Sequence, residues 1–449
     1  MSTALAPVQA NQRLTLVDAL RGLAVLGILA MNIVGFAFHP TVYSDPTVAG
    51  GSTGVNLWTF LVAGVVFDGK MRGIFTLLFG AGVYLLTTRA EQRGGGAFIA
   101  DIYYRRTLWL LLFGIAHAYL LWFGEVLFPY ALLGLALYPF RRMSARGLIW
   151  LWALQVVFMI AYGIYDARDL TEKHDIAVAA APLKKAGKTL TEDQEKALSS
   201  WEERAKHDKP EAAAVRKYTT LNTTGFVNSV KARMPIVLWW HSLSIYSPLQ
   251  YDLFAMMLLG MAFMKTGVLT GERSTAFYWK MIAAGYGVGL PLTYAQLRLQ
   301  VDGSFSILAN AWAGAWYEPA RIAVCLGHVA LIVLVFRHAR LAGIRRIFAA
   351  TGQMALTNYL MQSILCTLFF NVLGYHSQLQ RYQIYYVVAA IWLLELAWSP
   401  LWLRHFQFGP FEWAWRSLTY WQRQPMRLQS VTFDPQIEPR ESIPARSEV

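Results

Sequence analysis

Apolar runs of about 18 to 20 residues recur along this chain, and each is long enough to cross the hydrocarbon core of a bilayer as a helix. Only 15% of the residues are charged, whereas soluble domains carry roughly 25%. A chain in lipid must satisfy its backbone hydrogen bonds internally, and a helix does so within one segment. The sequence therefore predicts an all-α fold, a polytopic bundle of helices in a membrane.

The positive charges of the chain fall mostly in short segments between the apolar runs. These Arg-rich segments alternate with segments that are poor in Lys and Arg, and the Arg-rich ones are expected on the cytoplasmic side. The alternation predicts about ten spans with both termini in the cytoplasm. The same placement accounts for the net charge of +13, so we expect the lipid bilayer, and no nucleic acid, as a partner.

One hydrophilic block interrupts the apolar runs and divides the membrane part into two halves. Residues 166–233 contain 13 Lys or Arg and 11 Asp or Glu, a near-balance that favours export and exposed helices. The block is interpreted as a lid over an outward-facing cavity or as a mere insertion. The expected parts are a cytoplasmic N-terminal segment (1–15), spans 1 to 5 (16–165), an extracytoplasmic loop (166–234), spans 6 to 10 (235–403) and a basic, aromatic cytoplasmic tail with a disordered end (404–449).

An acid and a base open the first apolar run. Asp18 and Arg21 are spaced i,i+3, which places them on one face of a helix where they can pair. Charged residues at the mouth of a membrane helix are costly unless they pair or face a cavity. We therefore expect Asp18 and Arg21 to bind a substrate at the inner face. The alternative is that Arg21 is an inside-facing anchor and Asp18 its partner.

A second polar cluster, FDGKMRG, interrupts the long apolar stretch from 57 to 86. Its charged residues include Asp68 and Arg72. Irregular polar backbone at membrane depth persists only against protein or water, so this segment is expected to line a cavity. An ordinary extracellular turn between two helical pieces is the alternative.

The predicted topology places several polar residues in the outer half of the membrane or at its outer face: Asn32, His39, Asp68, Arg72, His117, Glu125 and His241. A carboxylate can orient an imidazole, which can then accept a proton from a hydroxyl or amine nucleophile. His117 is the first candidate for this general base, with Glu125 or Asp68 orienting it. His39 and His241 are alternative bases, and His117 as a satisfied core histidine is the structural alternative.

The predicted ninth span contains TGQMALTNYLMQS, which is unusually polar for a membrane helix. Its residues Gln353 and Asn358 start from the inner end, and we expect them to contribute to substrate binding there. No metal site is expected, because the nine His show no HxxxH or HExxH pairing and the two Cys lie far apart in the sequence.

Five motifs carry a resemblance to a known family: DALRGLAVLGILAMNI, DGKMRGIFTLLFGAG, GIAHAYLLWFGEVLFPYALLG, GQMALTNYLMQS and FGPFEWAWRSLTYWQRQPMR. With these motifs the chain resembles the YeiB-like bacterial membrane family, which is defined by a domain of unknown function. The resemblance implies a multi-pass protein of the bacterial inner membrane. Glu125 stands where the family more often has Asp, Met71 stands where it often has Phe, and the hydrophilic loop is harder to match.

The YeiB-like family is in turn distantly similar to transmembrane acyltransferases, which include lysosomal heparan-alpha-glucosaminide N-acetyltransferase. The shared element is D-x-x-R-G, here Asp18, Arg21 and Gly22, followed by Asn32. This resemblance implies that His39 is the nearest match to the proposed acetyl relay of those enzymes. They move an acyl group from cytosolic acyl-CoA across the membrane to a sugar or glycan.

These observations lead to an expected function. The chain is expected to be an O- or N-acyltransferase that uses acyl-CoA or acetyl-CoA and a glycan or other small acceptor, with Asn32 and Arg72 stabilising the oxyanion. A transporter or exporter of a small anionic or glycan-linked substrate is the alternative, and a membrane scaffold without turnover is a third. A homodimer is a possible assembly.

Overall fold

The structure is a computed structural model that describes residues 14–428, apart from 95, 97 and 243–247. Within these ranges every regular element is a helix, which confirms the all-α class. Most of the expected N-terminal segment, the end of the tail and part of PIVLWWHSLSIY lie outside the described residues. The elements are α1 (Thr15–Ala37), η3 (Pro40–Tyr43), α2 (Gly54–Val66), α3 (Lys70–Gln92), α4 (Phe98–Leu120), α5 (Leu127–Leu137), η4 (Tyr138–Arg142), α6 (Ala145–Lys185), α7 (Glu192–Asp208), α8 (Ala212–Thr223), α9 (Phe226–Ser242), α10 (Pro248–Lys265), α11 (Thr275–Asp302), α12 (Ile307–Ala315), α13 (Tyr317–Arg337), η6 (Ala339–Leu341), α14 (Ala342–Gln353), α15 (Ala355–Cys366), η7 (Thr367–Val372), α16 (Ile384–Leu403) and α17 (Pro410–Tyr420).

Six helical segments of the described chain are long and apolar enough to cross a membrane. Other helices of the bundle fall short in length or in mean hydropathy, or carry more charge; α5, for example, has 11 residues and a length of about 16 Å at 1.5 Å per residue. The six segments are Thr15–Ala37, Gly54–Gln92, Ala145–Lys185, Tyr317–Arg337, Ala355–Val372 and Ile384–Leu403.

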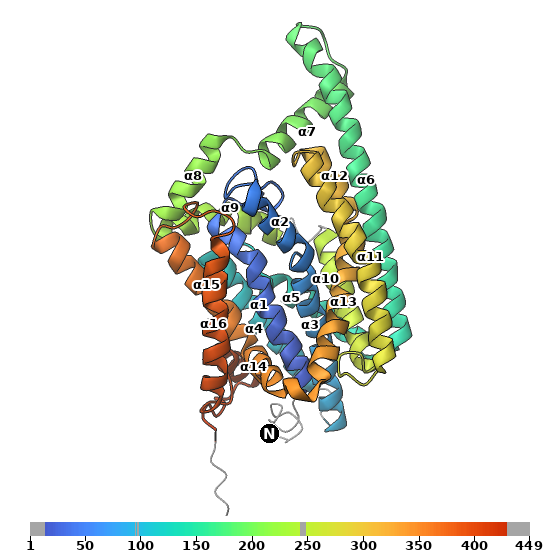
Figure 1. Cartoon of the computed structure of the whole chain (residues 1–449), viewed down its shortest axis with the longest axis vertical. Coiled ribbons are helices and arrows are strands. Elements are labelled where there is room, and N and C mark those ends of the chain that lie inside the picture. Colours follow the sequence, from blue (N-terminus) through green and yellow to red (C-terminus); the bar gives the residue numbers. More distant parts are fainter. Residues whose placement is uncertain (1–13, 95, 97, 243–247, 429–449) are drawn as a thin grey trace, which may run out of the picture.

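The bundle has two chemically different ends (Figure 1). The connections from α5 to α6 and from α13 to α14 lie at the end drawn lowest, and α1 begins there. We call it the basic end, after the Arg residues of those two connections and of the helix ends beside them: Arg141, Arg142, Arg146, Arg337, Arg340, Arg345 and Arg346. The opposite end, which carries α7, α8 and α12, is called the α8 end.

Two helix crossings depend on glycine. In the first, Gly22 of α1 meets Gly352 of α14, and a Cβ on Gly22 would collide with the Phe348 carbonyl. In the second, a Cβ on Gly80 of α3 would collide with the Met257 carbonyl of α10, and a Cβ on Gly260 of α10 would collide with the Leu77 carbonyl of α3. Small residues at such crossings let backbones approach closely, which is how many membrane helices pack. Gly22, the glycine of D-x-x-R-G, therefore lets α1 pack closely against α14, next to Asp18 and Arg21.

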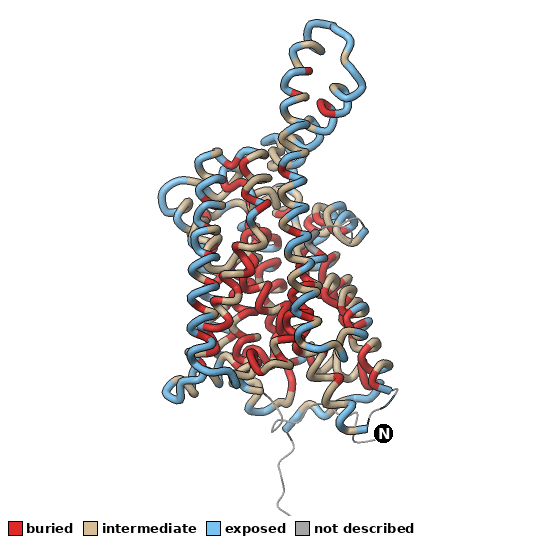
Figure 2. Tube along the Cα trace, turned by 90° about the vertical axis from the view of Figure 1, so that its right-hand side faces the viewer, coloured by how far each residue is buried: buried red, intermediate tan, exposed pale blue. Residues whose placement is uncertain are grey.

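The hydrophilic block does not begin at a helix boundary. Helix α6 starts near the basic end and continues as one helix beyond residue 165, to Lys185. Its far part projects with the start of α7 as an exposed hairpin (Figure 2). The expected limit at 234/235 likewise lies inside α9. Polarity changes at these two places while the helices continue, in α9 even across Pro235.

The chain breaks once inside a membrane-length segment and once directly before another. Between α2 and α3 the chain turns at Gly69, whose φ of +66° lies in the left-handed region open to glycine. Between α14 and α15 the chain turns at Met354, and no side chain at this turn caps the first backbone N–H groups of α15. A residue distant in the sequence caps them instead. Glu412 of α17 accepts hydrogen bonds from the backbone N–H groups of Leu356 (2.6 Å) and Thr357 (3.0 Å). A carboxylate at a helix N-terminus also complements the helix dipole.

Candidate functional site

A cavity of about 330 Å³ extends from the basic end into the bundle. Its walls come from α1, α3, α4, α5, α14, α15 and α17. Along α1 the lining runs from Leu14 to Ile28, about 20 Å at helical rise. Most of the interior is apolar, with Tyr103, Tyr130 and Tyr359 among the lining residues. We call it the basic-end cavity.

The mouth of this cavity is rich in arginine. Its lining includes Arg21, Arg89, Arg93, Arg106 and Arg416, against the two acids Asp18 and Glu412. The expected pairing of Asp18 with Arg21 is present, because Arg21 Nη1 lies 2.7 Å from Asp18 Oδ1. The Arg106 guanidinium stacks 3.8 Å from the Trp415 ring centroid. An excess of guanidinium groups over carboxylates makes this mouth suited to anions, and phosphates above all.

His117 lies just behind the wall of the cavity. Its ring centroid is 5.1 Å from that of Tyr359, which lines the cavity. His117 Nε2 is 2.7 Å from Ser363 Oγ, and Nδ1 has no hydrogen-bond partner among the described residues. The imidazole is buried and is separated from the cavity by one tyrosine.

Glu125 does not orient His117 in this structure. Its carboxylate accepts a hydrogen bond from the Phe128 N–H at 3.0 Å and lies 3.7 Å from His241 Nε2. The His241 ring stacks on Phe128 at 3.9 Å between centroids. Among the residues predicted to lie in the outer half, the carboxylate–imidazole pair is therefore Glu125 with His241, one of the alternative bases.

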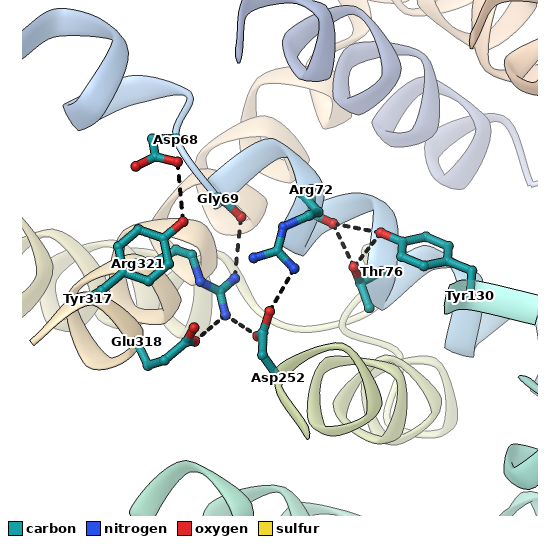
Figure 3. A network of polar contacts seen from close by, with 9 residues as sticks. All are labelled: Asp68, Gly69, Arg72, Thr76, Tyr130, Asp252, Tyr317, Glu318 and Arg321. Atoms are coloured by element: carbon teal, nitrogen blue, oxygen red, sulfur yellow. Dashed lines mark hydrogen bonds and ion pairs between the residues drawn. The ribbon is translucent and has the colours of Figure 1, made fainter. Parts of the chain in front are cut away.

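A buried charge network joins three helices beside the cavity (Figure 3). Arg72 Nη1 of α3 lies 2.7 Å from Asp252 Oδ2 of α10. Arg321 of α13 pairs with Asp252 and, at 2.5 Å, with Glu318. Two guanidinium groups and two carboxylates balance in charge, which is the condition under which ions persist at membrane depth.

The same network reaches the cavity through a tyrosine. The Tyr130 hydroxyl lies 2.5 Å from Thr76 Oγ1 and donates to the Arg72 carbonyl at 3.3 Å (Figure 3). In the other direction the Tyr317 ring lies 5.8 Å from the Arg321 guanidinium, and the Tyr317 hydroxyl donates to Asp68 at 3.2 Å. Asp68 and Arg72 therefore bond to different residues. Of the two, only Asp68 lines either of these cavities.

Asp68 lines a second, smaller cavity of about 50 Å³, which we call the polar pocket. This pocket shares no lining residue with the basic-end cavity. Lys70 and Arg381 also line it. The FDGKMRG segment therefore does line a cavity, as expected, although Arg72 turns away from it into the charge network.

His39 lies at the α8 end beneath α8. Its ring packs edge-on against Tyr218 of α8 at 4.9 Å, and its Nδ1 lies 2.9 Å from Thr41 Oγ1. The Tyr218 ring also lies 5.7 Å from His376. Burial, with His207 nearby, lowers the pKa of His39 to about 4, and burial with His39 nearby lowers the pKa of His376 to about 4. Both imidazoles are neutral at pH 7.

The remaining expected residues fall in different places. Gln353 lines the basic-end cavity, as expected. Asn358 is packed instead between helices, where its Nδ2 donates to the Thr351 carbonyl and to Ser399. Asn32 accepts a hydrogen bond from Tyr43 through its backbone carbonyl. The outer-half residues thus belong to several sites rather than one chamber.

Sequence reasoning missed three members of the charge network: Asp252, Glu318 and Arg321. A signal was present, because Asp252 and Arg321 stand inside predicted spans, where an ionisable residue indicates a functional or paired site. In the described part of the chain no group of three His, Cys, Asp or Glu is arranged to hold a metal ion.

Comparison with known proteins gives relatives along the whole chain. Residues 263–422 match the family described as "Protein of unknown function (DUF418)". The chain is 29% identical to the uncharacterized protein YxaH of Bacillus subtilis over 94% of this chain and 98% of the relative. It is 28% identical to the uncharacterized protein YeiB of Escherichia coli, over 91% and 96%. No solved structure matches the chain significantly.

Proposed function

We propose that this chain, a member of the YeiB-like family, is a membrane acyltransferase that binds an acyl-CoA in the basic-end cavity. The observation that carries the proposal is one cavity with an Arg-rich mouth and a largely apolar interior. Acyl-CoA has the complementary shape and charge, because its phosphates suit the guanidinium groups and its acyl chain suits the interior.

The proposal includes an orientation in the bacterial inner membrane. The basic end faces the cytoplasm, where acyl-CoA is present, and the α8 end faces outward. Ten crossings follow if the shorter or more polar α4, α5, α10 and α11 join the six membrane-length segments, each shielded by its neighbours. Both termini are then cytoplasmic, because α1 begins and α16 ends at the basic end (Figure 1).

The chemistry is a transfer from sulfur to oxygen or nitrogen. The acceptor atom attacks the thioester carbonyl, the carbon–sulfur bond breaks, and the acceptor's proton passes through an imidazole to the leaving thiolate. His117 is the candidate base, since its ring lies 5.1 Å from that of Tyr359, which lines the cavity. His39 lies at the α8 end, and the pair of Glu125 and His241 provides the other candidate. The acceptor is a small molecule or glycan on the outer side.

The first test measures acyl-CoA binding to the purified protein as a shift in thermal unfolding midpoint, with CoA, acetyl-CoA and longer acyl-CoAs. A ligand that binds the folded state raises this midpoint. Arg21→Ala, at the mouth, should reduce the shift, whereas Arg404→Ala, an exposed residue at the same end but outside the cavity lining, should leave it unchanged. No saturable shift with any of these ligands would refute the proposal.

The second test assigns the base. Transfer of a labelled acyl group should be lost in His117→Gln with the acyl-CoA shift retained. Full transfer by that variant would remove His117 from the mechanism, and the same assay on His39→Gln and His241→Gln would then identify the histidine that acts.

Transport of an anionic amphiphile is the second candidate, and one observation favours it. The basic-end cavity and the polar pocket share no lining residue, and the charge network reaches both, through Tyr130 at one and Asp68 at the other. Two cavities on either side of a closed charged layer are expected of alternating access. Flux of a labelled substrate into vesicles, without acyl transfer, would support transport over the enzyme.

A further inference from the structure

Two buried cations line the polar pocket, and neither has a described carboxylate within ion-pair distance. Lys70 is 2% exposed and donates to the Gly64 carbonyl at 2.6 Å. Arg381 is 3% exposed, and its side chain makes one long hydrogen bond, to the Val42 carbonyl at 3.4 Å. Neither forms an ion pair with any residue in the described part of the chain. A buried charge is costly without a counter-charge, so this pair of cations requires an explanation.

Two polar atoms of the pocket also lack hydrogen-bond partners among the described residues. They are Arg381 Nε and Thr293 Oγ1, and Thr293 is 1% exposed. Buried polar atoms are nearly always hydrogen-bonded, and each exception needs a reason such as a bound ligand. The two unpartnered atoms belong to residues of one cavity, reached from α11 and from the loop before α16.

The charge of the lining selects the ligand class. Asp68 is an acid of the same lining and accepts a hydrogen bond from Tyr317. With Lys70 and Arg381 the lining carries a net charge of +1, so it favours a monoanion. A guanidinium offers Nε and Nη in a planar fork that matches a carboxylate.

The size of the pocket limits how much of the ligand enters it. Its volume of about 50 Å³ equals a few water sites at roughly 10 to 15 Å³ each, which suits a carboxylate and one or two carbon atoms. Phe60, Tyr43 and Tyr385 provide apolar wall for those carbons.

From these observations we infer that the polar pocket is a binding site for the carboxylate of a small organic acid, held by Arg381, Lys70 and Thr293. The site lies in a cavity separate from the proposed acyl-CoA site and does not depend on acyl transfer. The carboxylate completes the hydrogen bonds of Arg381 Nε and of the Thr293 hydroxyl, and it supplies the missing counter-charge.

The test uses butyrate as the probe and butyramide as its neutral counterpart, which differs in charge but hardly in shape. Both are titrated at fixed ionic strength into the purified full-length protein, with the unfolding midpoint as the readout. Butyrate is expected to give a saturable rise and butyramide none. Inorganic phosphate is the third arm, and a shift with phosphate but not with butyrate would overturn the carboxylate assignment.

Variants locate the site. Thr293→Val removes a hydroxyl without a protein partner, so the free protein should unfold at the same temperature or higher, while butyrate affinity falls roughly two- to tenfold. Arg381→Gln should reduce the affinity roughly tenfold or more. Arg216→Gln, a substitution of an exposed residue of α8, should leave the butyrate affinity unchanged.

Equal butyrate affinity in Thr293→Val, Arg381→Gln and the parent would refute the site. The acyl-CoA shift measured on the same samples would still test the proposed enzyme.

Discussion

Arg72 Nη1 lies 2.7 Å from Asp252 Oδ2, and the other oxygen of that carboxylate pairs with Arg321. Asp252 is 1% exposed, so one buried carboxylate connects α3, α10 and α13. Glu318 provides the second negative charge against the two guanidinium groups. The arrangement is neutral as a whole and cannot lose one member without leaving an uncompensated charge in the interior.

Asp252→Asn is therefore expected to destabilise the protein severely. Removing one partner of a buried ion pair typically costs about 3–5 kcal/mol, because the remaining charge stays buried without compensation. The thermal unfolding midpoint of the purified variant measures the effect. The matched control is Glu192→Gln, which breaks an exposed pair with Lys196 on α7 and should leave the midpoint nearly unchanged. An Asp252→Asn protein as stable as the parent would show that the network is not a structural requirement.

The second prediction concerns Gly82, which lines the basic-end cavity in α3. A Cβ added there meets nothing within 4 Å, so a larger side chain can enter the cavity without a backbone clash. Gly82→Leu should keep or slightly raise stability, since Gly inside a helix costs about 0.5–1 kcal/mol relative to Ala. It should also reduce binding of long acyl-CoAs more than that of acetyl-CoA, measured as the ligand-induced shift of the unfolding midpoint.

Gly287→Leu is the matched control for this substitution. Gly287 lies in α11 with equally open space around its Cβ and lines neither cavity. Acyl-CoA binding should be unchanged in this variant. If Gly82→Leu also bound every acyl-CoA like the parent, the acyl chain would have to lie outside the basic-end cavity.

Local parts of the site could be predicted from the sequence, and long-range parts could not. The pair of Asp18 and Arg21 follows from helical spacing alone, and the structure confirms it. The pairing of Glu125 with His241 joins segments more than 100 residues apart, and hydropathy does not say which helices are neighbours. For the same reason the ion-pair partner of Arg72 could not be predicted.

Helix breaks show a related limit. The sequence predicts the ninth span as one continuous helix. In the structure the helix breaks at Met354, a position that is neither Gly nor Pro. The amides that the break exposes are bonded by Glu412, 56 residues further along. A break that depends on a distant cap leaves no local signal. By contrast, the break at Gly69 lies in FDGKMRG, and its glycine and charges did mark it.

The third prediction is a pH dependence at the α8 end. His39 and His376 pack against Tyr218 and have a pKa of about 4, compared with 6.5 for a free imidazole. When α8 detaches and exposes them, they bind protons at a higher pH than when α8 is docked. Proton uptake therefore favours the detached form, and docking should weaken as pH falls from 6.5 towards 4 and be fully present above 6.5.

Hydrogen exchange of the α8 amides, corrected for the intrinsic effect of pH, measures this docking. Protection should fall on acidification in the parent and depend much less on pH in the double variant His39→Gln, His376→Gln. His207 on α7 and the pair of buried Asp45 with partly exposed Lys209 face the same region and are left intact. His338→Gln, an exposed histidine at the basic end, should behave like the parent. Protection independent of pH in the parent would contradict the prediction.

The fourth prediction concerns Glu395, a fully buried carboxyl group on α16. Its Oε2 accepts a hydrogen bond from Gln362 Nε2 at 2.9 Å. Its Oε1 and the Oε1 of Gln362 both lack a partner in the described part of the chain, and no described cation pairs with the carboxyl group. Glu395→Gln keeps the shape, removes a negative charge from the interior and adds an N–H that can donate to Gln362. The variant should unfold at a higher temperature, with a gain of about 1–2 kcal/mol.

Glu395→Ala, which removes the acceptor of Gln362 and leaves a cavity, should unfold at a lower temperature than the parent. If both variants are less stable than the parent, the carboxyl group itself has a partner or proton that the amide cannot replace. If Glu395→Gln is more stable but loses acyl transfer, the group has been kept for activity at a cost in stability.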